Sequence, residues 1–94
     1  MVKGYVDGYV LPVPKKKLQA YRKLAQKAAK VWRKHGAVEY FECVGDDLGS
    51  KWSTIKFPRT VRAKPSETVV FSYIVFKSRK HRDTVNAKVM KDPL

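Results

Sequence analysis

The segment TVVFSYIVFKSRKHRDTVNAKVM, residues 68–90, decides the fold of this 94-residue chain. Its first part, residues 68–77, is an apolar run rich in β-branched and aromatic residues, which is typical of a buried strand. Ser78 follows, and a serine at this position can accept a hydrogen bond from the first turn of a helix. The remainder predicts that helix, which ends near residue 90 or 91 because Asp92 and Pro93 come next.

The junction between this strand and helix concentrates polar side chains beside an apolar strand. Polar groups are costly to bury unless they find hydrogen-bond partners, so the junction marks either a structural polar network or the wall of a site. Its residue types define no known reaction, and the catalytic residues, if there are any, stay unknown. The polar group comprises Ser78, Arg79, His81, Arg82, Asp83 and Asn86.

The chain before this segment contains a strand and a helix. Residues 3–11 alternate in hydrophobicity with a period of two, which indicates a strand, and we expect Pro12 and Pro14 to end it. Residues 15–35 change to the period of three and four that is typical of a helix with one apolar face. Gly36 follows as a natural helix terminator.

Residues 37–44 alternate again and predict a second strand, and residues 45–51 predict a loop. We interpret residues 52–63, which contain Pro58, as irregular or edge-strand chain. The resulting order predicts an α+β fold of the ferredoxin-like, split β-α-β kind, with an antiparallel sheet and two helices on one face. The final strand of that fold is missing. Either the C-terminal end is truncated, or a partner subunit or residues 52–63 fill its place.

The size of the chain predicts one domain over residues 1–94, with a thin core that self-association would help to cover. A single cysteine excludes an internal disulfide and fits a reducing compartment. Cys43, His35 and His81 lack the spacing of metal ligands, so we expect neither a metal nor another cofactor. The N-terminus does not resemble a signal peptide, and no stretch resembles a membrane span. We therefore expect a cytoplasmic protein without a membrane partner.

The formal net charge is +13, which favours contact with polyanions. The predicted helix over residues 15–35 contains no carboxylate, and its lysines project to one side, opposite Tyr21, Ala28 and Trp32. The lysines form either a nucleic-acid (RNA) contact or a merely solvated face, and no aromatic residues interleave with them to stack on bases. The candidate polyanion-binding residues are Lys16, Lys23, Lys27, Lys30, Lys34, Arg79 and Lys80.

Tyrosines and acids share one face of the first two predicted strands. If the helices cover the side of Val6 and Val10, these groups line a cavity on the opposite side, where Tyr73 or Ser72 joins them according to register. A carboxylate enclosed there could transfer protons. The alternative is that Asp7 and Glu42 pair with arginine or lysine across the sheet.

The second helix adds three candidates to this cavity. Its spacing places Arg82 and Asn86 beside Val85, so both are predicted to point inward, toward an anion or an acid of the sheet. The alternative is structural: Arg82 pairs with one acid, and Asn86 holds a loop backbone. His81 either titrates near neutrality or is a lone exposed histidine. The candidate pocket residues are Asp7, Tyr9, Tyr40, Glu42, Tyr73, His81, Arg82 and Asn86.

Four motifs that span the chain, YVDGYVLPVP, WRKHGAVEYFECVGDD, KFPR and ETVVFSYIVFKSRKHRDTVNAKVMKDP, closely resemble the YbaA-like family, domain of unknown function 1428. The resemblance implies a dimeric α+β barrel, in which two ferredoxin-like subunits close their sheets around a shared interior. Its superfamily includes cofactor-independent monooxygenases, isomerases and dehydratases. No catalytic residue can be carried over, because the family has no settled reaction. Family members usually continue beyond MKDP, whereas this chain stops at Leu94. They also have acids in the first helix, whereas the first predicted helix of this chain has none.

The leading hypothesis is an uncharacterised homodimer that binds a small molecule in the barrel interior, and it extends to a cofactor-independent enzyme. The rival is electrostatic RNA binding through the basic helix. A third hypothesis is an interaction protein whose dimer surface is its function.

Overall fold

The computed structural model describes residues 4–46, 48–49 and 55–93. Three strands form one antiparallel sheet in the order β1-β3-β2: β1 (Tyr5–Pro14), β2 (Glu39–Val44) and β3 (Glu67–Phe76). The strand β3 is central because it pairs with both of the others. Its buried position explains the continuous apolar run, since Val70 and Phe76 are fully buried. The predicted α+β class with an antiparallel sheet is confirmed.

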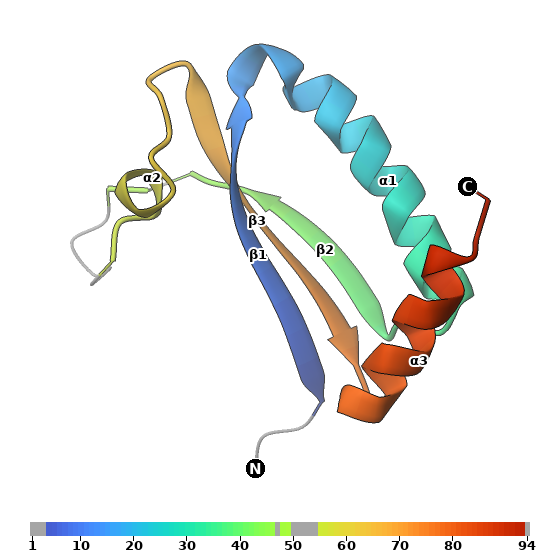
Figure 1. The fold of residues 1–94 in the computed structure, drawn as a ribbon. Helices are drawn as coiled ribbons and strands as arrows, with labels where there is room; N and C mark the ends of the chain where they lie inside the picture. The colour runs from blue at the N-terminus through green and yellow to red at the C-terminus, as the bar shows by residue number, and fades with distance from the viewer. Residues whose placement is uncertain (1–3, 47, 50–54, 94) are drawn as a thin grey trace.

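The two long helices, α1 (Leu18–Lys34) and α3 (Arg79–Met90), lie on the same side of the sheet (Figure 1). A single 3-10 turn, η1 (Lys15–Lys17), connects β1 to α1. Both predicted helix signals are confirmed. Gly36 follows α1 with a φ of 111°, and the Oγ of Ser78 accepts a hydrogen bond of 3.1 Å from the backbone N–H of His81.

One local prediction is wrong, and one of two alternatives for a second segment is not found among the described residues. The strand β1 does not end at residue 11 but includes Pro12 and Pro14. At the edge of a sheet a proline is tolerated, because its missing N–H can be on the side without a neighbouring strand. An edge strand was one alternative for residues 52–63, but Phe57–Thr60 form one helical turn, α2, with Pro58 in its first positions. Residues 52–54 lie outside the described residues.

The register shows which residues share a face. Tyr5 is opposite Phe76, Tyr40 is opposite Ile74, and Glu42 is opposite Ser72, and such cross-strand partners point to the same side. Ile74 and Phe76 belong to the core that Val31 of α1 and Val85 and Val89 of α3 complete. We call this covered side the helix face; from the strands it contains Tyr5, Asp7, Tyr9, Tyr40, Glu42, Ser72, Ile74 and Phe76.

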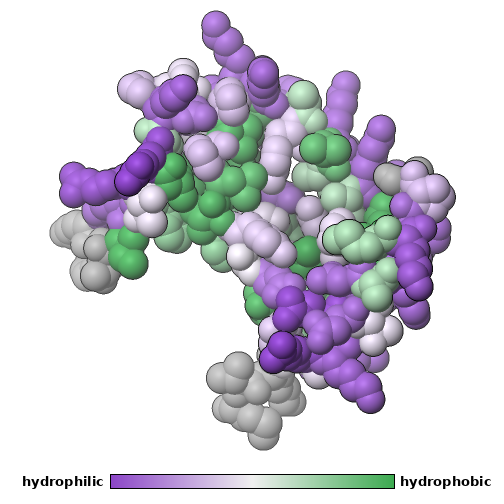
Figure 2. All heavy atoms as spheres, viewed as in Figure 1, coloured by the Kyte–Doolittle hydropathy of each residue, from purple (hydrophilic) through white to green (hydrophobic). Residues whose placement is uncertain are grey.

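The expectation that the helices cover the side of Val6 and Val10 is therefore wrong. That side faces away from α1 and α3. Among the described residues, α2 covers a part of it on β3, where the rings of Phe57 and Phe71 stack with their centres 6.3 Å apart. Figure 2 shows hydrophobic side chains gathered over the strands beside α2. We call this side the open face; it contains Val6, Gly8, Val10, Phe41, Cys43, Phe71, Tyr73 and Val75. Within the described residues, no helix is long and apolar enough to cross a membrane.

Candidate functional site

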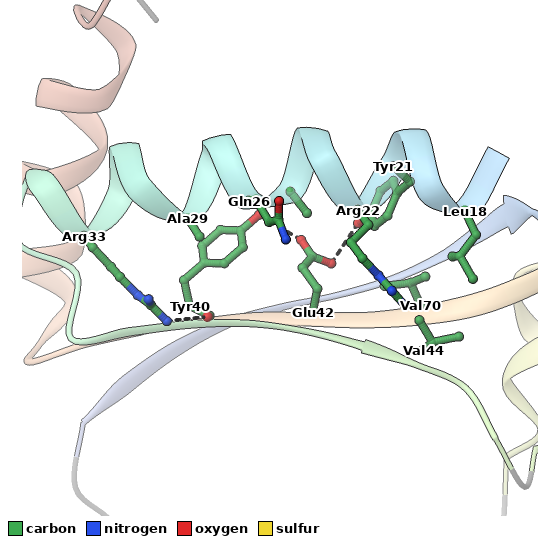
Figure 3. A pocket seen from close by; sticks show the side chains of 11 residues that line it. Leu18, Tyr21, Arg22, Gln26, Ala29, Arg33, Tyr40, Glu42, Val44 and Val70 are labelled. Carbon is green, nitrogen blue, oxygen red and sulfur yellow. Dashed lines mark hydrogen bonds between the residues drawn. The ribbon is translucent and has the colours of Figure 1, made fainter.

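Glu42 lies at the centre of a hydrogen-bonded group between α1 and β2 (Figure 3). Strand alternation places Tyr40 and Glu42 on the helix face, and α1 brings Tyr21 against them. The hydroxyl of Tyr21 donates to Oε2 of Glu42 at 2.8 Å, and the hydroxyl of Tyr40 donates to Oε1 at 2.8 Å. Both oxygens of the carboxylate therefore accept a hydrogen bond from a tyrosine.

The two tyrosines are held in their neutral form. Burial raises the pKa of Tyr21 and of Tyr40 well above the ordinary tyrosine value of about 10, and the hydrogen bond to Glu42 and its negative charge raise it further. For Tyr40 a hydrogen bond with Ser72 acts in the opposite direction and lowers the pKa. At neutral pH both phenols thus act as hydrogen-bond donors and not as bases.

A pocket of about 320 Å³ opens beside this carboxylate, between α1 and the strands β2 and β3. Its surface is more apolar than polar, and its polar groups come from both sides (Figure 3). Apolar and aromatic side chains with a few convergent polar groups are the usual composition of a small-molecule site. The aliphatic residues are Leu18, Ala25, Ala29, Val44 and Val70, and the polar ones include Arg22, Gln26, Arg33 and Glu42.

Two arginines of α1 border the pocket, and they differ in their partners. Nη2 of Arg33 donates to the backbone oxygen of Tyr40 at 3.2 Å, which occupies one carbonyl at the edge of the sheet. Arg22 is exposed and makes no hydrogen bond or ion pair with any residue that the structure describes. The pocket therefore combines a carboxylate that accepts two hydrogen bonds with a guanidinium that has no partner among the described residues.

A second polar cluster joins α3 to β1. Nη1 of Arg82 lies 3.4 Å from Oδ2 of Asp7, Nη2 donates to the hydroxyl of Tyr5 at 2.9 Å, and the guanidinium lies 5.1 Å from the centre of the Tyr5 ring. Nε of Arg82 lies 2.9 Å from Oδ1 of Asp83, an ion pair without hydrogen-bond alignment. The arginine pairing that the sequence predicts for Asp7 is thus present, whereas Glu42 pairs with tyrosines.

The other predicted pocket residues of α3 have structural contacts. Asn86 points inward, but it accepts a hydrogen bond of 3.1 Å from Nε1 of Trp32 and so connects α3 to α1, not to a loop. Nδ1 of His81 accepts a hydrogen bond of 3.0 Å from the backbone N–H of Lys77, and its ring meets Phe76 edge-on. Neither residue lines the pocket beside Glu42.

The two remaining tyrosines do not join the pocket either. Tyr73 lies on the open face, where its ring packs against Phe41 and Phe71, because the register places Ser72 and not Tyr73 beside Glu42. Tyr9 lies on the helix face, but 47% of it is exposed. The eight predicted residues therefore do not form one cavity. Tyr40 and Glu42 belong to one cluster, and Asp7 and Arg82 to another.

Tyr21 and Arg22 are not among the pocket residues that the sequence predicts. The helical spacing did place Tyr21 on the sheet side of α1, opposite the lysines, but its contact with Glu42 spans 21 positions of sequence and depends on tertiary packing. Arg22 follows directly and lies at the border of that side. Within the described residues, no group of three or more His, Cys, Asp and Glu side chains could hold a metal ion.

The predicted polyanion-binding residues are on the surface. Lys16, Lys23, Lys27 and Lys30 are exposed, whereas Nζ of Lys34 lies 3.3 Å from Oδ2 of Asp92. The same oxygen lies 2.7 Å from Nε2 of His35. The other two candidates, Arg79 and Lys80, are exposed in the first turn of α3.

Comparison with known proteins identifies the family. The family model described as "Protein of unknown function (DUF1428)" matches residues 4–94. The chain is 43% identical over 89 residues to "Uncharacterized protein YbaA" of Escherichia coli (strain K12), an alignment that covers 95% of this chain and 75% of the relative. The proteins of the same description from Escherichia coli O157:H7 and Shigella flexneri match with the same identity and coverage. The chain belongs to the DUF1428 family of proteins of unknown function.

Proposed function

We propose that this protein is a homodimer that binds a small polar molecule in the pocket between α1 and β2. The observation that carries the proposal is the carboxylate of Glu42, which Tyr21 and Tyr40 hold in place beside a pocket of about 320 Å³. The sequence-based hypothesis placed the ligand in a barrel interior shared by two subunits. The position of Asp7, Tyr40 and Glu42 on the helix face favours instead a pocket within each subunit.

The open face supports the homodimer. Val6 is 54% exposed, Phe41 is 41% exposed and Phe71 is 38% exposed, although all three are strand residues on one side of the sheet. A contiguous exposed apolar surface marks an interaction site in a soluble protein. A second copy that packs its own open face against this one, with the sheets about 10 Å apart, would cover both surfaces.

The order of the elements supports the finer description of the subunit. The sequence β1-α1-β2-β3-α3, with the sheet order β1-β3-β2, matches the first five elements of a ferredoxin-like fold. Two such subunits with their open faces together form the dimeric α+β barrel that the family resemblance implies. In this arrangement α1, α3 and the pocket of each subunit are on the outside of the sheet pair.

An NMR screen tests pocket binding directly. We would record backbone amide spectra of the wild-type chain against a set of neutral, acidic and basic fragments and follow the amides of Tyr40 and Glu42. The variant Ala29→Trp places a large ring in the pocket, because Ala29 lines it. Ala87→Trp, the same change at an exposed site of α3, is the matched control.

We expect at least one class of fragment to change the chemical shifts of these amides in the wild type. The same fragments should not change them in Ala29→Trp. The control should bind like the wild type. If no fragment shifts the amides around Glu42, or if Ala29→Trp binds as well as the wild type, the pocket is not the site and the proposal fails.

The second candidate is RNA binding. The observation that favours it is the exposure of Lys16 in η1 and of Lys23, Lys27 and Lys30 in α1, two elements that contain no acid. Fluorescence anisotropy with single-stranded RNA and duplex DNA, from about 50 to 200 mM salt, tests it, because phosphate contacts weaken steeply with salt. The triple change Lys23→Gln, Lys27→Gln and Lys30→Gln should weaken binding and reduce its salt dependence. Absence of binding at the lowest salt would reject this candidate.

A further inference from the structure

The guanidinium of Arg22, which is unpaired within the part of the chain that the structure describes, indicates what the pocket can bind. Its side chain extends from α1 across the pocket toward Val44 and Val70 (Figure 3). It makes no ion pair or hydrogen bond with any of the described residues. A guanidinium presents donors in a planar fork that fits the two oxygens of a carboxylate. Arg22 therefore provides a place for an acidic group.

Glu42 adds a second requirement. Each of its carboxylate oxygens already accepts one tyrosine hydroxyl, and each has a further lone pair that can accept a hydrogen bond from a ligand. A simple anion would be repelled by this carboxylate. A molecule that carries a donor, such as an ammonium or a hydroxyl, close to its acidic group can satisfy Glu42 and Arg22 together.

The charge of the surroundings agrees with an acidic ligand. The sequence contains no carboxylate between Asp7 and Glu39, and nine lysines and arginines lie in that interval, all of them in η1 and α1. A positive potential of this kind attracts anions to the surface before they bind. One side of the pocket is therefore cationic, and Glu42 provides the negative charge on the other.

The walls and the volume limit the size of the ligand. Leu18, Ala25, Val44 and Val70 provide an aliphatic surface beside the polar groups. The volume of about 320 Å³ is at the lower end of the range of small-molecule pockets. The ligand is thus small and has an apolar part that can cover this surface.

We propose that the pocket binds a small amino or hydroxy acid with an aliphatic side chain, its carboxylate on Arg22 and its amino or hydroxyl group on Glu42. The inference rests on the pocket of the proposed function and adds the class of ligand. It gives Arg22 the role of recognising the acid and Glu42 the role of recognising the donor beside it.

Four related compounds test the two polar contacts separately. Leucine and leucic acid carry both the acid and the donor, isocaproate lacks the donor, and leucinamide lacks the acid. Titration of the wild-type chain, followed by the amide shifts of Tyr40 and Glu42, should show binding of leucine or leucic acid. Isocaproate and leucinamide should each bind about tenfold more weakly or worse, because each leaves one charged group of the pocket without its partner.

Two variants on α1 locate the effect. Arg22→Gln should weaken the binding of leucine or leucic acid, whichever binds more tightly, about tenfold. It should also remove the difference in affinity between leucine and leucinamide. Lys23→Gln removes one positive charge at the next position of α1. Because Lys23 does not line the pocket, the affinity should change by no more than about twofold. Circular dichroism of both variants checks that the helix is intact.

The outcomes separate this inference from the proposed function. If isocaproate or leucinamide binds as tightly as leucine and leucic acid, the assigned ligand class is wrong. The same holds if none of the four compounds binds while other fragments enter the pocket and are excluded by Ala29→Trp; in both cases the pocket itself stands. If no compound of any class shifts the amides around Glu42, the proposed function fails as well.

Discussion

The two faces of the sheet are built from alternate residues of the same strands, yet they differ in polarity and in the elements that cover them. The helix face carries Asp7 and Glu42, and each of these acids has a partner on a covering helix. The open face carries exposed apolar side chains, with Phe41 and Phe71 among them. The more polar side of a sheet can therefore be the side that helices cover. Polar groups are stable beside a core when they are paired, and an apolar face left without a helix marks an interface.

The largest difference between the faces should appear on truncation of a phenylalanine. Phe76 of the helix face is fully buried, so Phe76→Ala should lower the free energy of unfolding by about 3–5 kcal/mol at any protein concentration. Phe71→Ala on the open face removes the same atoms from a side chain that is 38% exposed. Urea denaturation should show a smaller loss that depends on protein concentration. Equal, concentration-independent losses for both variants would show that the faces do not differ in this way.

The pairing of acids on the helix face can be measured at Asp7. The side chains of Arg82 and Asp7 are 25% and 18% exposed, so Asp7→Asn should cost about 1–2 kcal/mol of stability, less than breaking a fully buried pair. In a double-mutant cycle with Arg82→Gln, the two changes should be coupled by about 1 kcal/mol. If the two losses simply add, the ion pair contributes no stability and the polar residues are not held on this face by pairing.

The smallest effect concerns the tyrosines beside Glu42. Because the pKa of Tyr21 and Tyr40 is raised in the folded protein, the unfolded chain loses these protons first, near pH 10. Their contribution to stability is thus complete below about pH 10 and decreases as the pH rises above it. In an ultraviolet absorbance titration, Tyr21 and Tyr40 should ionise above the ordinary tyrosine pKa of about 10.

The variant Glu42→Gln removes the charge and keeps one acceptor oxygen, while an amide NH2 replaces the oxygen that accepts from the other hydroxyl. It should therefore lower the pKa of Tyr21 and Tyr40 toward the ordinary value without reaching it, because burial remains. Glu39→Gln on the same strand, at an exposed position, should leave the titration unchanged. An unchanged titration in Glu42→Gln would show that its carboxylate does not control the two phenols.

Features that depend on neighbours in sequence could be predicted from the sequence. The Ser78 cap and the helix after it follow from local hydrogen bonding, and the apolar run of β3 follows from its central position. The alternation of β1 separates the residues of two faces but does not say which face the helices cover. That choice depends on whether the polar side chains find partners. Asp7 finds Arg82, which lies 75 positions away.

The pocket was only half predictable for the same reason. Tyr40 and Glu42 lie two residues apart on one strand, so their common face follows from the period of two. The contribution of Tyr21 depends on the docking of α1. The exclusion of Tyr73 depends on the pairing register of β2 and β3, because a shift by one residue would place Tyr73 and not Ser72 beside Glu42.

The proposed division between a helix face that binds a ligand and an open face that self-associates is tested most directly by sedimentation equilibrium. The wild-type chain should have about twice its monomer mass of 10.8 kDa. Val6→Glu, a change at the most exposed of the apolar strand residues on the open face, should reduce the mass to that of the monomer. Val38→Glu, at a similarly exposed valine just before β2, should remain dimeric. A wild-type chain that sediments at 10.8 kDa at every concentration would contradict the account.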